Sequence, residues 1–372
     1  MADLSGRKQM RTVMKRLVLR LHELALRLGL IVLPKHYYVP IPDLHELRRT
    51  RGRWARRSEM RGVGIDLAAQ AERLVELVQP FEPEYRANHA YRTATAGACG
   101  PGFGAIEAQA LHGFVRGARP RRIVEVGSGV STYCMIEAGR LNAREGMPTA
   151  ITCIEPYPSP WLRQAPVELI ARPIEEVPLE LFDGLEAGDL LFIDSTHTVR
   201  VGGDVMRIVM EILPRLPPGV FVHFHDIYLP YDFQRDADRS LFQWMETALL
   251  HAYLIDNARI EIVFCLSQLH YDRPELLRAV FPSYDPEPAV GGLRIAEAGA
   301  DKHFPSSIYL RTKAAPPADR VPTPTDGSPR RNSTTRRRPH PRSPRSTTGR
   351  SGSTSKFATR LGWPGRRARR SP

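Results

Sequence analysis

Short apolar runs alternate with longer amphipathic segments over most of the chain. Seven of these runs have the length and composition of buried strands: Ile123–Val126, Ala150–Ile154, Glu168–Ala171, Asp189–Ile193, Val220–Phe224, Ile260–Leu266 and Ser307–Arg311. Strands that alternate with helices form a mainly parallel sheet that is covered on both faces. The pattern therefore predicts an α/β fold, a Rossmann-like seven-stranded sheet with helices on both faces.

Apolar residues at helical spacing mark the segments between and before these strands. The predicted helices are Met10–Leu30, Gly64–Val78, Ala105–Arg116, Thr132–Leu141, Val177–Leu185, Gly203–Leu216, Arg239–Ile255 and Pro274–Phe281. The first is amphipathic, with Leu17, Leu21, Leu24 and Leu28 on one face and arginines on the other. We expect this helix to pack on the core; a membrane surface or a partner helix is the alternative.

Composition divides the 372 residues into three parts. Residues 1–80 form a basic helical extension, residues 81–313 the α/β domain, and residues 314–372 a tail rich in Pro, Arg, Ser and Thr that we predict to be disordered. Residues 1–62 carry a net charge of +10 and residues 314–372 of +13, which leaves −10 for residues 63–313. The basic ends therefore suit peripheral contact with anionic surfaces, and no specific nucleic-acid target is indicated.

The four cysteines form no CxxC pair, which is typical of reduced thiols in a reducing compartment. There is no run of eighteen uncharged apolar residues, so we expect no membrane span. A cytoplasmic protein is predicted, with a membrane-peripheral location through its basic ends as a variant of that prediction.

Three of the predicted strands end in an acidic residue. Glu125 precedes the glycine turn Gly127-Ser128-Gly129, while Glu155 and Asp194 follow two further strands. Parallel sheets bind ligands at this edge, where glycines let the backbone approach and helix N-termini offer free N–H groups. A carboxylate after the second strand can accept both hydroxyls of a ribose, so the pattern indicates a nucleoside cofactor, either NAD or S-adenosylmethionine.

The spacing of the glycines favours the second cofactor. NAD fingerprints require GxGxxG, whereas here Gly129 is followed by Ser131 and Thr132 without a third glycine. Glu125 would repel a pyrophosphate but attract a sulfonium or an ammonium group. An NAD-dependent oxidoreductase on a similar fold, and a non-catalytic scaffold that binds anionic surfaces, are the alternative interpretations.

Four motifs together resemble the class I S-adenosylmethionine-dependent methyltransferases, more narrowly the group called methyltransferase domain 24. The motifs are VEVGSGVST, CIEPYP, LFIDSTHT and VHFHDIYLP, and the similarity covers about Phe81 to Lys313. The resemblance implies that the first loop holds the amino-acid end of the cofactor and that Glu155 holds its ribose. Many members have glycine at the position of Ser131. The expected cofactor-binding residues are Glu125, Gly127, Ser128, Gly129, Ser131, Glu155 and Asp194.

The fourth and fifth strands bring candidate catalytic residues to the same edge. His197 follows the fourth strand, while His225 and Asp226 end the fifth. His197 is the first candidate for a general base, because an alcohol or phenol loses its proton as the methyl group arrives. Alternatively, Asp194, His225 and Asp226 bind Mg²⁺ or another divalent cation, an arrangement similar to that of catechol-type O-methyltransferases.

We therefore expect an S-adenosylmethionine-dependent methyltransferase that acts on a hydroxyl of a small molecule or glycan. The segment IDSTHT differs from the NPPY or DPPY motif of many base methyltransferases, which argues against a nucleic-acid base as acceptor. Arg48–Arg61 is rich in arginine and predicts a solvated face or a phosphate-contacting patch. Aromatic residues in Leu229–Phe233, and Trp244, lie where a substrate lid is expected, although ordinary packing is the more common role of such residues.

Overall fold

The computed structural model describes residues 2–33, 36, 38–97, 99, 102–286 and 302–314. The chain divides into two units, residues 1–318 and 319–372. The predicted disordered tail lies outside the described residues, except for Ala314. None of the described helices combines the length and the apolar character that a bilayer span needs.

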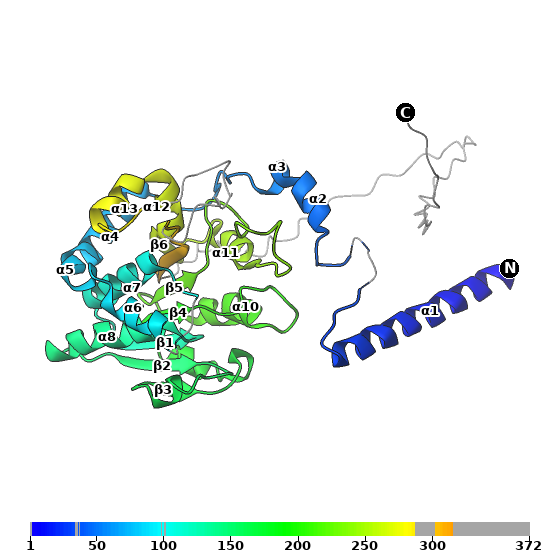
Figure 1. Cartoon of the computed structure of the whole chain (residues 1–372), viewed down its shortest axis with the longest axis horizontal. Helices are drawn as coiled ribbons and strands as arrows, with labels where there is room; N and C mark the ends of the chain where they lie inside the picture. Colours follow the sequence, from blue (N-terminus) through cyan, green and yellow to red (C-terminus); the bar gives the residue numbers. More distant parts are fainter. Residues whose placement is uncertain are drawn as a thin grey trace, which may run out of the picture. The chain divides into compact units, whose positions relative to one another are not determined.

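A seven-stranded sheet forms the centre of the first unit (Figure 1). Its strands are β1 (Arg122–Val126), β2 (Ala150–Ile154), β3 (Glu168–Ile170), β4 (Leu190–Ile193), β5 (Phe221–His225), β6 (Ile260–Cys265) and β7 (Ser307–Thr312), in the order β3-β2-β1-β4-β5-β7-β6. The strands from β3 to β5 are parallel, and β7 runs antiparallel between β5 and β6. The predicted mainly parallel α/β sheet is confirmed, and each strand lies within one residue of its predicted bounds.

Helices cover both faces of the sheet, as predicted (Figure 1). On one face the buried cluster contains residues from α4 (Leu67–Leu77), α7 (Ala105–Ala118), α8 (Val130–Arg144), α12 (Leu266–Asp272) and α13 (Pro274–Val280). On the other face it contains residues from the π-helical turn η4 (Ile208–Ile212), which continues α10 (Asp204–Arg207), and from α11 (Glu246–Leu254). Alternate strand residues supply the two clusters, since successive strand side chains point to opposite faces.

The long helix α1 and several short helices and turns complete the described part of the chain. They are α1 (Ala2–Arg27), α2 (Leu44–Arg49), α3 (Arg51–Trp54), α5 (Glu82–Tyr85), α6 (His89–Ala96) and α9 (Glu180–Asp183), together with the 3₁₀ turns η1 (Gln79–Phe81), η2 (Leu162–Gln164), η3 (Ile174–Glu176) and η5 (Leu213–Arg215). Within the predicted extension 1–80, α4 contributes Leu74 to the same buried cluster as Phe114 of α7. The extension is therefore part of the packed unit from α4 onward.

Several elements differ in their bounds from the prediction: α1 begins at Ala2 rather than Met10, and α9 covers only Glu180–Asp183 of the predicted Val177–Leu185. The helix expected over Arg239–Ile255 begins only at Glu246, because the N–H groups of Met245 and Glu246 donate to the carbonyl of His197 at 3.0 and 3.2 Å. The strand expected to reach Leu266 ends at Cys265, where α12 starts directly.

The leucine face of α1 is exposed in the structure. Leu17, Leu21, Leu24 and Leu28 have between 52% and 71% of their surface exposed. Packing of this face on the core, as expected from the sequence, is therefore not seen.

Candidate functional site

The loop after β1 requires glycine at its first position. Gly127 has a φ of +98°, and a Cβ there would lie 2.1 Å from the carbonyl oxygen of Asp194. Its N–H donates to the carbonyl of Ile154 at the end of β2. The loops after β1, β2 and β4 consequently pack backbone to backbone at one edge of the sheet, the edge at which parallel sheets bind ligands.

Glu155 and Ser128 are joined at this edge. The hydroxyl of Ser128 donates to Glu155 Oε2 at 3.2 Å, and the N–H of Tyr157 donates to Oε1 at 2.8 Å. The side chain of Glu155 is neither fully buried nor fully exposed. A partly exposed carboxylate held by two donors has acceptor capacity left for the hydroxyls of a ribose.

Glu125 lies beneath the glycine loop. Its carboxylate accepts hydrogen bonds from Ser131 Oγ and Thr132 Oγ1, both at 2.6 Å, and from Cys153 Sγ at 3.3 Å. Burial disfavours its charge more than these bonds favour it, so the pKa is raised to about 7. The observed contacts of Glu125 and Ser131 thus support the loop from below; contact of either residue with a cofactor stays a prediction.

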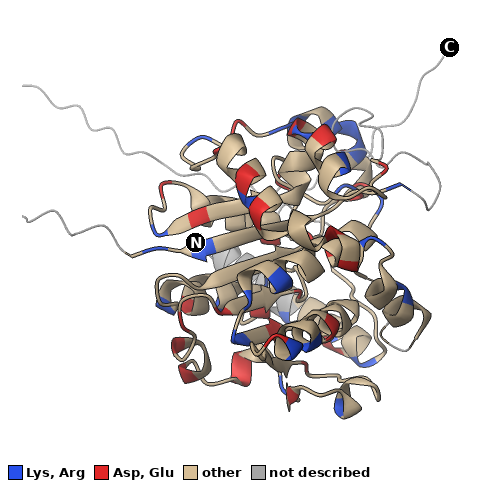
Figure 2. Cartoon of the chain, turned by 90° about the vertical axis from the view of Figure 1, so that its left-hand side faces the viewer, with Lys and Arg blue, Asp and Glu red and all other residues tan. Residues whose placement is uncertain are grey.

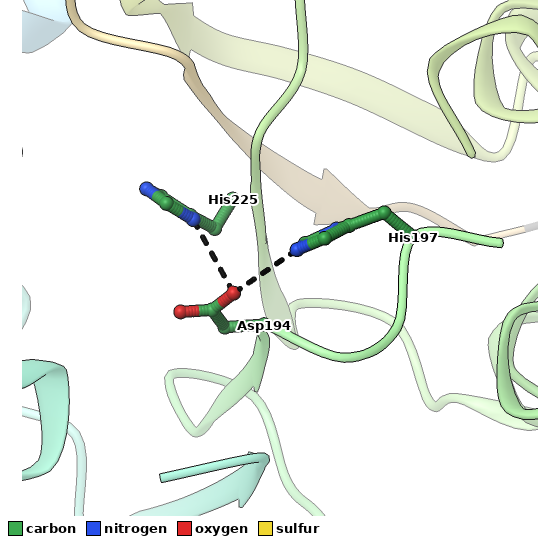
Figure 3. A group of neighbouring side chains, drawn as sticks. All are labelled: Asp194, His197 and His225. Carbon is green, nitrogen blue, oxygen red and sulfur yellow. Dashed lines mark hydrogen bonds and ion pairs between the residues drawn. The ribbon is translucent and has the colours of Figure 1, made fainter. Parts of the chain in front are cut away.

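Asp194 lies between two imidazoles (Figure 3). Its Oδ1 is 3.3 Å from His197 Nε2 and 3.3 Å from His225 Nδ1. One ligand atom from each of the three residues lies within 4.8 Å of the others, a spacing that can hold a metal ion. We call Asp194, His197 and His225 the Asp-His-His cluster.

A buried carboxylate lies behind each imidazole of the cluster. Glu246 Oε2 is 2.8 Å from His197 Nδ1, and Glu107 Oε1 is 3.2 Å from His225 Nε2. The two glutamates are 1% and 4% exposed. The hydrogen bond with Glu246 fixes the ring of His197 and directs its inner nitrogen to Asp194, as the outer partners of metal-binding histidines do. Glu107 lies at ion-pair distance from His225 Nε2 without a hydrogen bond.

Asp226 completes the cluster from the end of β5. Its Oδ1 accepts from the hydroxyls of Tyr228 and Ser306 at 3.1 and 3.0 Å, while Oδ2 lies 3.6 Å from both inner imidazole nitrogens. His197 and Asp226 have φ values of +56° and +52°, in the left-handed region that non-glycine residues rarely adopt. Such strain persists where the surrounding structure enforces it, and it clusters at functional sites.

The charges of the cluster depend on one another. Burial would raise the pKa of Asp194, but the charge of His225 and hydrogen bonds from both imidazoles hold it well below its usual range. Burial would lower the pKa of His197, but Asp194 and Glu246 raise it to about 10. The pKa of His225 is likewise raised well above its usual value, against the effect of burial, by Asp194 and Asp226. The site therefore demands positive charge, which two protons or one divalent cation would supply.

The structure brings the predicted residues of the fourth and fifth strands together, but one residue of the candidate metal-ligand set differs from the prediction. The metal-ligand set expected from the sequence was Asp194, His225 and Asp226, whereas the atoms at metal-ligand spacing include His197 in place of Asp226. Sequence reasoning missed Glu107 and Glu246. The available signal was an acid within an otherwise buried helical stretch, since Glu107 is flanked by Ile106, Ala108 and Ala110.

Comparisons with known proteins bear on the same residues. A family model described as "Methyltransferase domain" matches residues 124–227. An uncharacterized protein of Archaeoglobus fulgidus is 31% identical over 173 residues, which cover 42% of this chain and 75% of that protein.

Two solved structures are similar at lower identity. A putative protein-L-isoaspartate O-methyltransferase of Plasmodium falciparum, in complex with S-adenosyl-L-homocysteine, is 16% identical over 49% of this chain and 81% of that chain, with a TM-score of 0.23. The CMeT domain of the citrinin polyketide synthase is 15% identical over 81% of this chain and 79% of that chain, with a TM-score of 0.28. Similarities of this size do not establish a common fold.

Proposed function

Because the chain belongs to the methyltransferase-domain family, we propose that it transfers the methyl group of S-adenosylmethionine to a hydroxyl oxygen of a small molecule or glycan. The observation that carries this proposal is that residues 124–227, which match the family, contain both the glycine loop and the Asp-His-His cluster. An NAD-dependent oxidoreductase is not favoured, because the loop lacks a third glycine.

The edge formed by β1 and β2 fits the proposed cofactor. The loop at Gly127 has no room for a side chain, so the backbone can approach a ligand closely, and the partly exposed Glu155 is placed to accept from a ribose. S-adenosylmethionine supplies an activated methyl group on a sulfonium. The protein then has to position the acceptor oxygen in line with that group and to remove one proton.

The Asp-His-His cluster fits a divalent cation held by Asp194 Oδ1, His197 Nε2 and His225 Nδ1. Two imidazoles and one carboxylate favour first-row transition ions such as Mn²⁺, Fe²⁺ or Zn²⁺ over Mg²⁺, which prefers oxygen ligands. When bound, such an ion would lower the pKa of an acceptor hydroxyl. Glu107 and Glu246 would orient the imidazoles from behind.

We assign His197 the role of a ligand rather than that of the general base. Without a cation, an imidazole whose pKa is raised to about 10 keeps its proton at neutral pH and cannot accept one from an alcohol; a cation that displaces this proton would itself occupy Nε2. Asp226 Oδ2 is the better candidate to take the hydroxyl proton, because the hydroxyls of Tyr228 and Ser306 occupy the other oxygen of that carboxylate.

Calorimetry with S-adenosylmethionine tests the cofactor. We expect the wild type to bind it and Glu155→Ala to weaken binding at least tenfold, because a carboxylate that accepts ribose hydroxyls would be lost. Glu176→Ala is the matched control, since Glu176 is an exposed glutamate outside the β1–β2 edge. Absence of binding by the wild type would refute the proposed function.

A second titration separates the two roles of His197. Chelator-treated protein is titrated with Mn²⁺ and with Mg²⁺, and we expect the wild type to bind Mn²⁺ more tightly. His197→Ala should lose most of this affinity, whereas a general base would leave it unchanged. Labelled methyl transfer onto a cell extract, with and without chelator, then shows whether the ion takes part in the reaction.

We also propose a reducing, cytoplasmic location with peripheral contact to anionic surfaces. The four cysteines are free, which supports the compartment. The exposed leucines of α1, beside exposed Arg16, Arg20 and Arg27, support the surface contact. Sedimentation of the full chain with vesicles that contain phosphatidylserine, compared with neutral vesicles, tests it.

A further inference from the structure

A groove of about 770 Å³ lies between the arginine-rich segment 53–61 and the chain that follows β5. Asp232 and Phe233 form part of its wall, and His251 and Ile255 close it from α11 and the residue that follows this helix. We call it the arginine groove. It joins two features that the sequence left without a function, the arginines of Arg48–Arg61 and the aromatic segment after the fifth strand.

The segment that carries the arginines is held in place by specific contacts. The N–H of Ser58 donates to the carbonyl of Pro230 at 2.8 Å, and Arg51 Nη1 lies 2.6 Å from Asp238 Oδ2. The rings of Trp54 and Phe233 meet edge to face at 6.2 Å. The groove is thus built by contacts on both of its walls.

The charge of the groove is unbalanced. Four arginines line it, against two acids, Glu59 and Asp232. Arg57 pairs with Asp272 and Arg61 with Glu59, both at 2.5 Å. Among the described residues, Arg53 and Arg56 have no carboxylate within ion-pair distance.

This excess of positive charge is local. Residues 63–313 carry a net charge of −10, and basic and acidic residues are interspersed over the side of the chain drawn in Figure 2. A general attraction of the folded domain for anions therefore does not account for the groove.

A buried histidine nitrogen in the groove wall also lacks a partner. His251 Nδ1 lies 2.6 Å from Asp232 Oδ1, but Nε2 is buried and has no hydrogen-bond partner among the described residues. A buried polar atom without a partner destabilises the folded chain, and a ligand atom would offset this cost. The guanidinium groups of Arg53 and Arg56 are donors only and suit an oxyanion, and His251 Nε2 is a polar atom of the same groove that a ligand could contact.

The same loop that forms the groove wall also covers the candidate site. Phe233 is followed by Gln234, whose Oε1 accepts from the N–H of Trp244. The ring of Trp244 lies 5.0 Å from that of His197. Helix α11 carries both Glu246, the partner of His197, and His251 of the groove wall. The arginine groove and the Asp-His-His cluster therefore share the chain that follows β5 and one helix.

We infer that the arginine groove binds a phosphate or sulfate group of the methyl acceptor. The statement that the bound group belongs to the methyl acceptor rests on the proposed function. The statement that the groove binds an oxyanion rests on the groove alone. Planar guanidinium groups bind tetrahedral oxyanions through paired hydrogen bonds, and Arg53 and Arg56 are placed to do so. The acceptor is then a small molecule or glycan that carries an ester of this kind beside the hydroxyl to be methylated.

The test is calorimetry of the full-length protein with pyrophosphate and with inorganic sulfate, without S-adenosylmethionine. We expect the double variant Arg53→Ala/Arg56→Ala to lower the affinity for the better probe at least tenfold. Arg163→Ala/Arg172→Ala is the control, because these arginines are also exposed and do not line the groove. Circular dichroism establishes that both variants are folded.

Equal affinities of the two double variants would overturn the inference, as would absence of binding by the wild type. Binding of phosphatidylserine vesicles, but of neither probe, would also overturn it and identify a lipid surface. Because no methyl transfer is measured, these results do not depend on the proposed function. Pretreatment of a cell extract with phosphatase or sulfatase should then lower the labelled methyl incorporation, and unchanged incorporation after both would refute the link to the acceptor.

Discussion

Replacement of Glu125 by glutamine tests the electrostatics beneath the glycine loop. The carboxylate is fully buried, with hydrogen bonds from Ser131, Thr132 and Cys153 as compensation. Glutamine has nearly the same shape and resembles the protonated acid. The substitution therefore removes a buried charge and leaves the packing of the loop nearly unchanged.

The size and sign of the effect follow from the pKa of Glu125. Burial raises it from its ordinary value of 4.5 to about 7, so the folded chain holds this proton more tightly than the unfolded chain. The contribution of Glu125 to stability is therefore most favourable below about pH 4.5 and is lost as the pH rises to about 7. The loss amounts to about 3 kcal/mol at pH 8, where glutamine has no charge to bury.

Urea denaturation of the wild type and of Glu125→Gln at pH 5 and pH 8 measures this effect. The free energy of unfolding of the variant, relative to the wild type, should be about 2–3 kcal/mol more favourable at pH 8 than at pH 5. Taking this difference cancels the other titrating groups, and Glu176→Gln, at an exposed glutamate, serves as the control. A relative stability of Glu125→Gln that is the same at both pH values would refute the burial argument.

Three further substitutions test other parts of the structure. Gly127→Ala should lower the free energy of unfolding by more than about 1–3 kcal/mol, the cost of a left-handed backbone, because the new Cβ would also overlap the backbone after β4. Gly146 has a φ of +83° and open space around it, so Gly146→Ala measures the backbone cost alone in the same denaturation experiment. Arg116→Ala should cost about 1–3 kcal/mol by thermal denaturation, because the arginine is 4% exposed and Glu84 and Glu145 would each lose one of two basic partners; an unchanged stability would contradict a buried network. Glu246→Gln should weaken Mn²⁺ binding about 10–100-fold in calorimetry, because His197 loses its negatively charged partner, and unchanged affinity would contradict that role.

The sheet could be predicted from the sequence because its strands are short apolar runs with clear ends. Each of the runs at β1, β2 and β4 stops at an acid, and glycine follows within two residues of Glu125. The start of α11 could not be predicted in the same way. Residues 239–245 have apolar positions at helical spacing, but the carbonyl of His197, about fifty residues earlier, takes the first N–H groups of the helix. A bond to a distant loop leaves no local signal.

The residues of the candidate site that lie at strand ends could be predicted from the sequence, but the buried glutamates that contact them could not. Asp194, His197, His225 and Asp226 follow or end strands, so topology alone brings them to one edge. Glu107 reaches His225 from a helix that begins more than a hundred residues earlier in the chain. Its burial explains the need for Gly104, because a Cβ there would overlap Glu107 Oε2. Only the packing of α7 against the sheet reveals that contact.

Because β7 is the last of the described strands in the sequence but lies beside β5 in the sheet, the site depends on a segment that is synthesised late. Ser306 directly precedes β7; its N–H donates to Glu107 at 2.7 Å and its hydroxyl donates to Asp226 at 3.0 Å. During synthesis, β5 can pair with β4 at once, but its second neighbour, β7, emerges only some eighty residues later. A nascent chain can therefore pair its first five strands and still lack the serine that holds both acids, so the candidate site is complete only after the last strand has been inserted.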